Sequence, residues 1–111
     1  MLIGCAFFEG KVKTGCEQQF AAYVQDRLVP LWTRFPGAKE VRVLRQHLSD
    51  TDQPHYAMVL QIKYLNMAAV ENALQSDIRK QSRAETEGLI QHFEGRIFHT
   101  LFDAAHDVAL A

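Results

Sequence analysis

The segment His55–Tyr64 constrains the fold of this chain more than any other stretch. Large apolar side chains stand at every second position within it: Tyr56, Met58, Leu60, Ile62 and Tyr64. Because side chains of a β-strand point alternately to its two faces, this pattern predicts a strand with one strongly apolar face. The opposite face carries Ala57 and Val59 beside polar residues, which is typical of a central strand that is covered on both sides.

Three other segments have the pattern of strands. Residues 2–8 are a short apolar run that ends before Glu9-Gly10, residues 38–48 alternate with charged side chains, and residues 96–102 alternate again. The charges in 38–48 are typical of an edge strand, where they discourage pairing with another sheet. Residues 49–54 have the composition of a loop, so we expect 38–48 and the central strand to form a hairpin.

A long amphipathic helix is predicted after the first strand. Its apolar residues recur at spacings of three or four: Phe20, Val24, Leu28, Leu31 and Phe35. Thr14 and Glu17 have the spacing of a capping box at its start. Pro30 predicts a kink or a break, because it removes a hydrogen bond and crowds the carbonyl of Asp26. The bend either wraps the helix around the sheet or opens a gap over it.

The second helical region is predicted to consist of two pieces. Asn66 can cap a helix over 67–75, and Ser76 or Asp77 can cap the next helix, with Gly95 just past its end. The apolar face of that helix is interrupted by Ser82 and Thr86. This polar gap either admits a polar ligand or allows close packing.

The order β-α-β-β-α-β predicts an α+β, ferredoxin-like fold with a four-stranded antiparallel sheet and helices on one face. The other face of the sheet cannot be polar, because the adjacent residues Phe7 and Phe8 must point to opposite sides. Phe98 and Leu101 also differ in parity. The exposed apolar area would exceed that of an ordinary monomer, so we predict a homodimer with the two sheets packed face to face.

Composition and charge exclude several classes of protein. A net charge of −1 over 111 residues argues against nucleic-acid binding. Arg79, Lys80 and Arg83 are followed by Glu85 and Glu87, and we interpret them as a solvated helix face. No apolar run reaches the roughly 18 residues of a membrane span, so no membrane association is predicted.

Cofactor and metal motifs are not found in the sequence. Cys5 and Cys16 do not form a metal or redox motif, and two thiols in a chain with this much core favour a reducing, cytoplasmic location. The histidines lack the spacing of metal ligands, and there is no glycine-rich phosphate loop. We therefore predict no metal and no cofactor.

Several short stretches together carry a resemblance to a known family. They are LVPL at 28–31, FPG at 35–37, the strand HYAMVLQIKY, ALQSDIR at 73–79 and FEGRI at 93–97. With them the chain resembles the dimeric α/β-barrel superfamily, most closely its EthD-like branch, over nearly its whole length. The resemblance implies one such domain over residues 1–103, followed by a tail over 104–111 that extends as a helix or reaches a partner as an arm.

The superfamily includes cofactor-free monooxygenases, lactone isomerases, polyketide cyclases and haem-degrading enzymes. EthD-like proteins often have a histidine where this chain has Leu28, and the polyketide cyclases have one where it has Ile78. Neither histidine can be carried over. Tyr23 matches the position of a pocket tyrosine in some relatives.

These observations predict a cofactor-independent enzyme of monooxygenase, isomerase or cyclase type that acts on an aromatic or polyketide-like compound. His99 or His47 is the expected acid/base group, and Tyr23 assists it. The expected substrate contacts are Trp32, Tyr56, Gln61, Arg45 and Ser82. The alternative is a non-catalytic ligand-binding or stress-response protein of the same fold. The two are distinguished by whether a histidine and a tyrosine converge on one pocket.

Overall fold

The strands and helices follow the predicted order in a computed structural model that describes residues 1–111. The strands are β1 (Leu2–Val12), β2 (Ala38–Leu44), β3 (Tyr56–Tyr64) and β4 (Phe93–Asp103). The helical elements are α1 (Glu17–Tyr23), the π-helical turn η1 (Val24–Leu28), α2 (Val29–Trp32), α3 (Met67–Leu74) and α4 (Asp77–Ile90).

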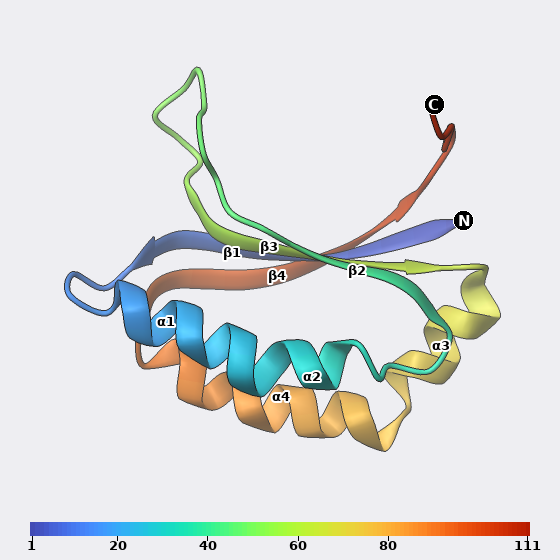
Figure 1. Ribbon diagram of the computed structural model, residues 1–111, viewed down its shortest axis with the longest axis horizontal. Coiled ribbons are helices and arrows are strands. Elements are labelled where there is room, and N and C mark those ends of the chain that lie inside the picture. The colour runs from blue at the N-terminus through green and yellow to red at the C-terminus, as the bar shows by residue number, and fades with distance from the viewer.

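The strands form one antiparallel sheet in the order β2-β3-β1-β4. The predicted central strand is β3, which lies between β1 and β2, and the predicted edge strand is β2. All helices lie on one side of the sheet, and no helix covers the other side (Figure 1). The ferredoxin-like α+β fold is therefore confirmed. No helix of the chain has the length and hydrophobicity to cross a membrane.

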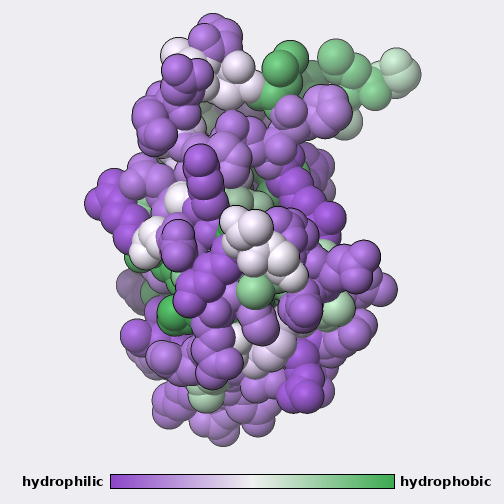
Figure 2. All heavy atoms as spheres, turned by 90° about the vertical axis from the view of Figure 1, so that its left-hand side faces the viewer, coloured by the Kyte–Doolittle hydropathy of each residue, from purple (hydrophilic) through white to green (hydrophobic).

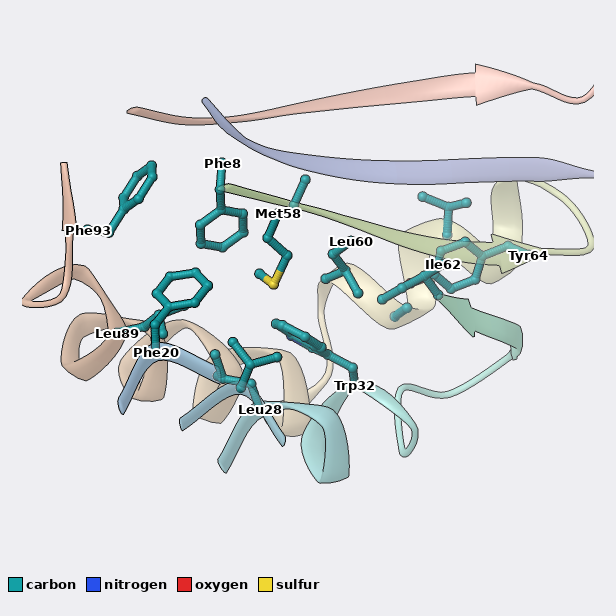
Figure 3. Close-up of a cluster of buried hydrophobic side chains, with 14 residues drawn as sticks. Phe8, Phe20, Leu28, Trp32, Met58, Leu60, Ile62, Tyr64, Leu89 and Phe93 are labelled. Carbon is teal, nitrogen blue, oxygen red and sulfur yellow. The ribbon is translucent and has the colours of Figure 1, made fainter. Parts of the chain in front are cut away.

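The hydrophobic core lies between the sheet and the helices. Met58, Leu60 and Ile62 of β3 point down toward Leu28 and Trp32 of the helical layer (Figure 3). Met58 and Leu28 are almost completely buried. The alternation that predicts β3 from the sequence thus identifies the face of this strand that packs on the helices.

The sequence predicts Tyr56 on the same face of β3 as Met58. This prediction is wrong, because the register of β1 and β3 shifts between Phe8 and Glu9. Tyr56 pairs with Glu9, and its ring lies 5.5 Å from the ring of Phe7. Phe8 faces the core, so its neighbour Phe7 and with it Tyr56 lie on the uncovered face. A β-bulge changes which side chains share a face, and strict alternation cannot predict this.

Pro30 produces a π-helical turn and leaves the helical path continuous. The turn η1 directly precedes α2, whose first residues include the proline. Pro30 has no N–H for the carbonyl of Asp26 and its ring crowds that carbonyl, and the wider π turn relieves the conflict. Where the sequence predicts a kink or a break, the structure therefore has a change of helical pitch.

Two of the predicted helix caps are confirmed. The Oδ1 of Asn66 accepts a hydrogen bond from the N–H of Ala69 at 3.0 Å, and the Oγ of Ser76 accepts from Arg79 N–H at 3.2 Å. The capping box at Thr14 is wrong, because α1 begins after Cys16 without a side-chain cap. A turn at Gly15 separates Thr14 from the first helical N–H groups.

The sequence predicts Gly95 just past the end of a helix, but in the structure it belongs to β4. It pairs with Gly10 of β1, and both glycines have positive φ angles, 151° and 138°. A Cβ on either residue would overlap the backbone of the opposite strand. The two glycines therefore allow β1 and β4 to remain paired to their ends.

Candidate functional site

A cavity of about 560 Å³ lies between the covered face of the sheet and helices α2, α3 and α4. Its apolar wall comes from both layers and includes Phe8, Leu60, Ile62, Trp32, Val70 and Leu74. A volume of this size is in the usual range of small-molecule pockets.

The cavity exists because β1 carries small residues at two successive positions that face the helices. At one end of the core Phe8 fills the space, and its ring lies 5.8 Å from the ring of Phe93. Farther along the same face of β1 come Ala6 and Gly4, which leave the space above the helices unfilled. The alternation Gly4-x-Ala6-x-Phe8 thus divides the helical layer into a filled half and a hollow half.

The polar groups that line the cavity, here called the polar wall, come from α4 and from the sheet. Helix α4 supplies them at the spacing of one helical face: Arg79, Ser82, Arg83, Thr86 and Glu87. The sheet supplies His99 from β4 and Tyr64 from β3. The site therefore has a mainly apolar lining with a small set of polar groups, an arrangement that orients an asymmetric ligand.

His99 is the titratable group of the cavity most suited to proton transfer. It lies opposite Ala6 in the β1–β4 register, so no large neighbour covers its inner side. Burial lowers the pKa of the His99 imidazole below its ordinary value, and the positive charges of Arg79 and Arg83 lower it further. The ring is therefore mainly neutral at pH 7 and able to accept a proton. The burial of His99 is partial, because the residue as a whole is exposed.

Trp32 forms a rigid part of the cavity wall. Its indole Nε1 donates a hydrogen bond to the Oγ of Ser82 at 3.0 Å, and both residues are buried. A buried indole N–H needs an acceptor, and Ser82 supplies it where a helix usually carries an apolar residue. The polar gap predicted at Ser82 and Thr86 therefore has a packing role and also lines the cavity.

Tyr64 adds a phenol to the polar wall. Burial raises the pKa of its hydroxyl, and the nearby Arg79 partly offsets this effect. The phenol is therefore protonated at neutral pH and able to donate a hydrogen bond into the cavity.

Of the residues that the sequence predicts for the site, His99, Trp32 and Ser82 line the cavity. Tyr23 does not, which corrects the expectation that a histidine and this tyrosine converge. The Tyr23 hydroxyl donates to the backbone carbonyl of Glu85 at 2.7 Å, where α1 packs on α4.

The other predicted residues also lie elsewhere. The second strand ends at Leu44, four residues earlier than predicted, so Arg45 and His47 are exposed in the loop before β3. This loop rises past the uncovered face of the sheet (Figure 1). Tyr56 and Gln61 are on that uncovered face, since Tyr56 contacts Phe7 and Gln61 pairs with Cys5.

Sequence reasoning missed several polar residues of the cavity, among them Tyr64, Arg79, Arg83 and Glu87. The two arginines were interpreted as part of a solvated helix face. Arg79 and Arg83 are spaced from Ser82 so that they lie on the same side of α4. This spacing is the signal that could have identified them. Elsewhere in the chain, no group of three His, Cys, Asp or Glu side chains lies close enough to hold a metal ion.

The arrangement of strands and helices is a ferredoxin-like fold that several solved structures share. An EthD family protein from Bacillus halodurans superposes with a TM-score of 0.67 at 14% identity, over 93% of this chain and 98% of that one. SnoaB, a cofactor-independent oxygenase from Streptomyces nogalater, gives 0.65 at 18% identity over 96% of each chain.

A putative antibiotic biosynthesis monooxygenase from Nitrosomonas europaea is also similar, with a TM-score of 0.62 at 14% identity over 96% of this chain and all of that one. No model of a known protein family matches the sequence, and no curated protein is significantly similar to it. At these identities the likeness concerns the fold alone, and the predicted ferredoxin-like fold is confirmed.

Proposed function

We propose that the protein is a small-molecule enzyme that needs no cofactor and acts on an aromatic or polyketide-like compound, with His99 as its acid/base group. The observation that carries the proposal is a neutral histidine among the polar groups of a large, mainly apolar cavity. The cofactor-independent oxygenase among the structural neighbours supports the same class of chemistry.

The proposed first step is proton abstraction from a carbon next to a carbonyl. A ring nitrogen of His99 takes the proton, and the electrons of the C–H bond move onto the carbonyl oxygen to form an enolate. Donors on the polar wall, such as the Tyr64 hydroxyl, stabilise the new charge. Three reactions start in this way, and all three remain within the proposal.

The fate of the enolate separates these reactions. Reprotonation at another carbon gives an isomerase, and attack on a second carbonyl gives a cyclase. Reaction with O₂ gives a monooxygenase: the carbon bonds to O₂ as a peroxide that His99 protonates, and cleavage of the O–O bond with loss of the second hydrogen of that carbon leaves a ketone and water. His99 returns to its neutral form when it gives up its proton in each case.

The dimer is the second part of the proposal. The uncovered face of the domain formed by residues 1–103 carries an apolar cluster in which the Phe7 ring stacks on Phe98 at 5.0 Å, with Phe102 at 6.4 Å. We propose that two such faces pack against each other. These aromatic side chains lie on an uncovered face of the sheet, so they need a partner surface that removes them from water.

The tail over residues 104–111 is proposed as an arm that reaches the partner subunit. It rises past the uncovered face on the same side as the loop before β3 (Figure 1). Val108 and Leu110 are 76% and 89% exposed, and a hydrophobic segment projects from a mostly hydrophilic surface at the upper edge of Figure 2. A cytoplasmic location remains a prediction from the two free thiols.

A ligand-binding protein without catalytic activity is the alternative. The placement of Tyr23 favours it, because the predicted tyrosine partner of the histidine is bonded to Glu85 and does not reach the cavity. In this alternative His99 provides a hydrogen bond to a ligand and does not transfer a proton to or from carbon.

Hydrogen–deuterium exchange of 2-tetralone in D₂O tests the proposal independently of the later steps. We expect the protein to accelerate loss of the proton resonances at its acidic carbon, and His99→Asn to reduce this rate by about 100-fold or more. His47→Asn, in the exposed loop, is the matched control and should leave the rate unchanged. Equal rates for wild type and His99→Asn would contradict the role of His99, and binding without exchange would support the alternative.

A further inference from the structure

Arg79 and Arg83 lie one turn apart on α4, and both line the cavity. Neither takes part in any ion pair of the structure, whose basic members are Arg27, Arg42, Lys63, Lys80 and Arg96. The one hydrogen bond of the Arg79 side chain is a long contact of 3.5 Å to the carbonyl of Leu74. Both arginines therefore line the cavity without a carboxylate partner, with Arg79 half-buried and Arg83 exposed.

The positive field of these two arginines reaches across the cavity. Both contribute to lowering the pKa of His99 on β4, and Arg79 also acts on Tyr64 of β3. Glu87 lines the same cavity one turn beyond Arg83, but it forms no ion pair with it. The polar wall thus combines two positive charges with a neutral imidazole and a neutral phenol.

We propose that Arg79 and Arg83 form an anion-binding subsite in this cavity, and that the natural ligand is an aromatic compound ionised at neutral pH through a carboxylate or an acidic phenol. This inference rests on the proposed small-molecule function and adds the charge of the ligand to it. The apolar wall around Leu60, Ile62 and Val70 accommodates the ring system, while the ionised oxygen lies at the arginines.

Guanidinium groups are suited to this task. Each presents several N–H donors in one plane, so an ionised oxygen can accept charge-assisted hydrogen bonds from both side chains. The low polarity of the opposite wall strengthens the attraction relative to water. The location beside His99 places the ionised oxygen close to the group that transfers the proton.

Isothermal titration calorimetry with 2-naphthoate and 2-naphthamide tests the inference on the full-length protein. The two ligands share a ring system and nearly the same shape, and only the first carries a charge. We expect 2-naphthoate to bind at least about tenfold more tightly, as charge-assisted hydrogen bonds require. Arg83→Gln and Arg79→Gln should each reduce this preference, and the double variant should abolish it.

Lys80→Gln is the matched control. Lys80 lies on the same helix between the two arginines, its side chain is 73% exposed, and it does not line the cavity. The change removes the same charge from the protein, so it accounts for long-range electrostatics. We expect Lys80→Gln to retain the full preference for 2-naphthoate.

The outcomes separate this inference from the proposed function. Equal affinity for the two ligands would overturn the anion subsite but leave a ligand-binding cavity intact. A preference that survives in the Arg79→Gln/Arg83→Gln variant, or that is equally reduced by Lys80→Gln, would overturn the assignment to these arginines. Binding of neither compound would contradict both the cavity as a ligand site and the subsite within it.

Discussion

The indole Nε1 of Trp32 and the Oγ of Ser82 form a buried hydrogen bond of 3.0 Å, although the residues are 50 positions apart in the sequence. The bond joins α2 to α4 and holds the indole ring as a wall of the cavity. Ser82 is buried, and its hydroxyl satisfies the indole N–H. Packing and site geometry therefore depend on the same contact.

Replacement of Ser82 by alanine should destabilise the protein. The indole N–H of Trp32 would lose its acceptor in a buried position, which costs about 1–3 kcal/mol. Urea unfolding monitored by circular dichroism would measure this change in the free energy of unfolding. If the bond is responsible, Ser82→Ala should cost clearly less in a Trp32→Phe background, where no indole N–H remains. Strict additivity of the two substitutions would contradict this explanation.

The contact between Tyr23 and Gly88 predicts a second coupling. A Cβ on Gly88 would overlap the Tyr23 hydroxyl and lie 2.6 Å from its Cζ. Gly88→Ala should therefore destabilise the protein by about 1–3 kcal/mol through overpacking, although alanine favours a helix by itself. In a Tyr23→Ala background the same substitution should be neutral or stabilising. A loss of stability by Gly88→Ala that is the same in both backgrounds would show that the clash is not the cause.

The pKa of His99 gives a prediction for pH dependence. NMR titration should place it below the ordinary value of 6.5, and Arg83→Gln should raise it, because the substitution removes a positive charge that opposes protonation. Lys80→Gln, on the same helix but away from the cavity, should change it much less. An unshifted His99, or a pKa that falls in Arg83→Gln, would contradict the arrangement of charges described above.

The same shift affects stability. The folded-state pKa of His99 is lowered, so the unfolded state binds more protons at pH values between that pKa and about 6.5. The free energy of unfolding therefore falls as the pH decreases through this interval. Urea unfolding at several pH values should show this decrease in the wild type. It should be smaller in His99→Asn, which cannot titrate there. Identical pH profiles for the two proteins would assign the decrease to other groups.

The sequence was sufficient for the fold because each element has a strong local pattern. The alternation around Met58 and Leu60, the helical spacing of Phe20, Val24 and Leu28, and the cap at Asn66 all correspond to what the structure shows. Errors occur where local patterns do not decide the outcome. Tyr56 changes face through a bulge, which depends on pairing between strands.

The site was only partly predictable for a related reason. His99, Trp32 and Ser82 were recognised because their residue types are unusual in their elements. Arg79 and Arg83 look like surface residues until the position of the hollow beside them is known. That hollow arises from Gly4 and Ala6, which are distant in the sequence, so the site is a product of tertiary structure.

The uncovered face of the sheet gives the last prediction. Val59 lies near its centre, paired with Phe7 of β1 and Leu44 of β2. If two such faces pack together, Val59→Lys brings a desolvated charge into each half of the interface and should raise the dimer dissociation constant by about thirtyfold or more.

Native mass spectrometry over a range of concentrations would follow this change. Ala84→Lys, on the exposed surface of α4, adds the same charge on the helical side and should leave the dimer intact. A wild-type mass of one chain would overturn the dimer, and a stable Val59→Lys dimer would place the interface elsewhere. A monomeric Val59→Lys variant that keeps its circular dichroism spectrum reports on association and not on folding.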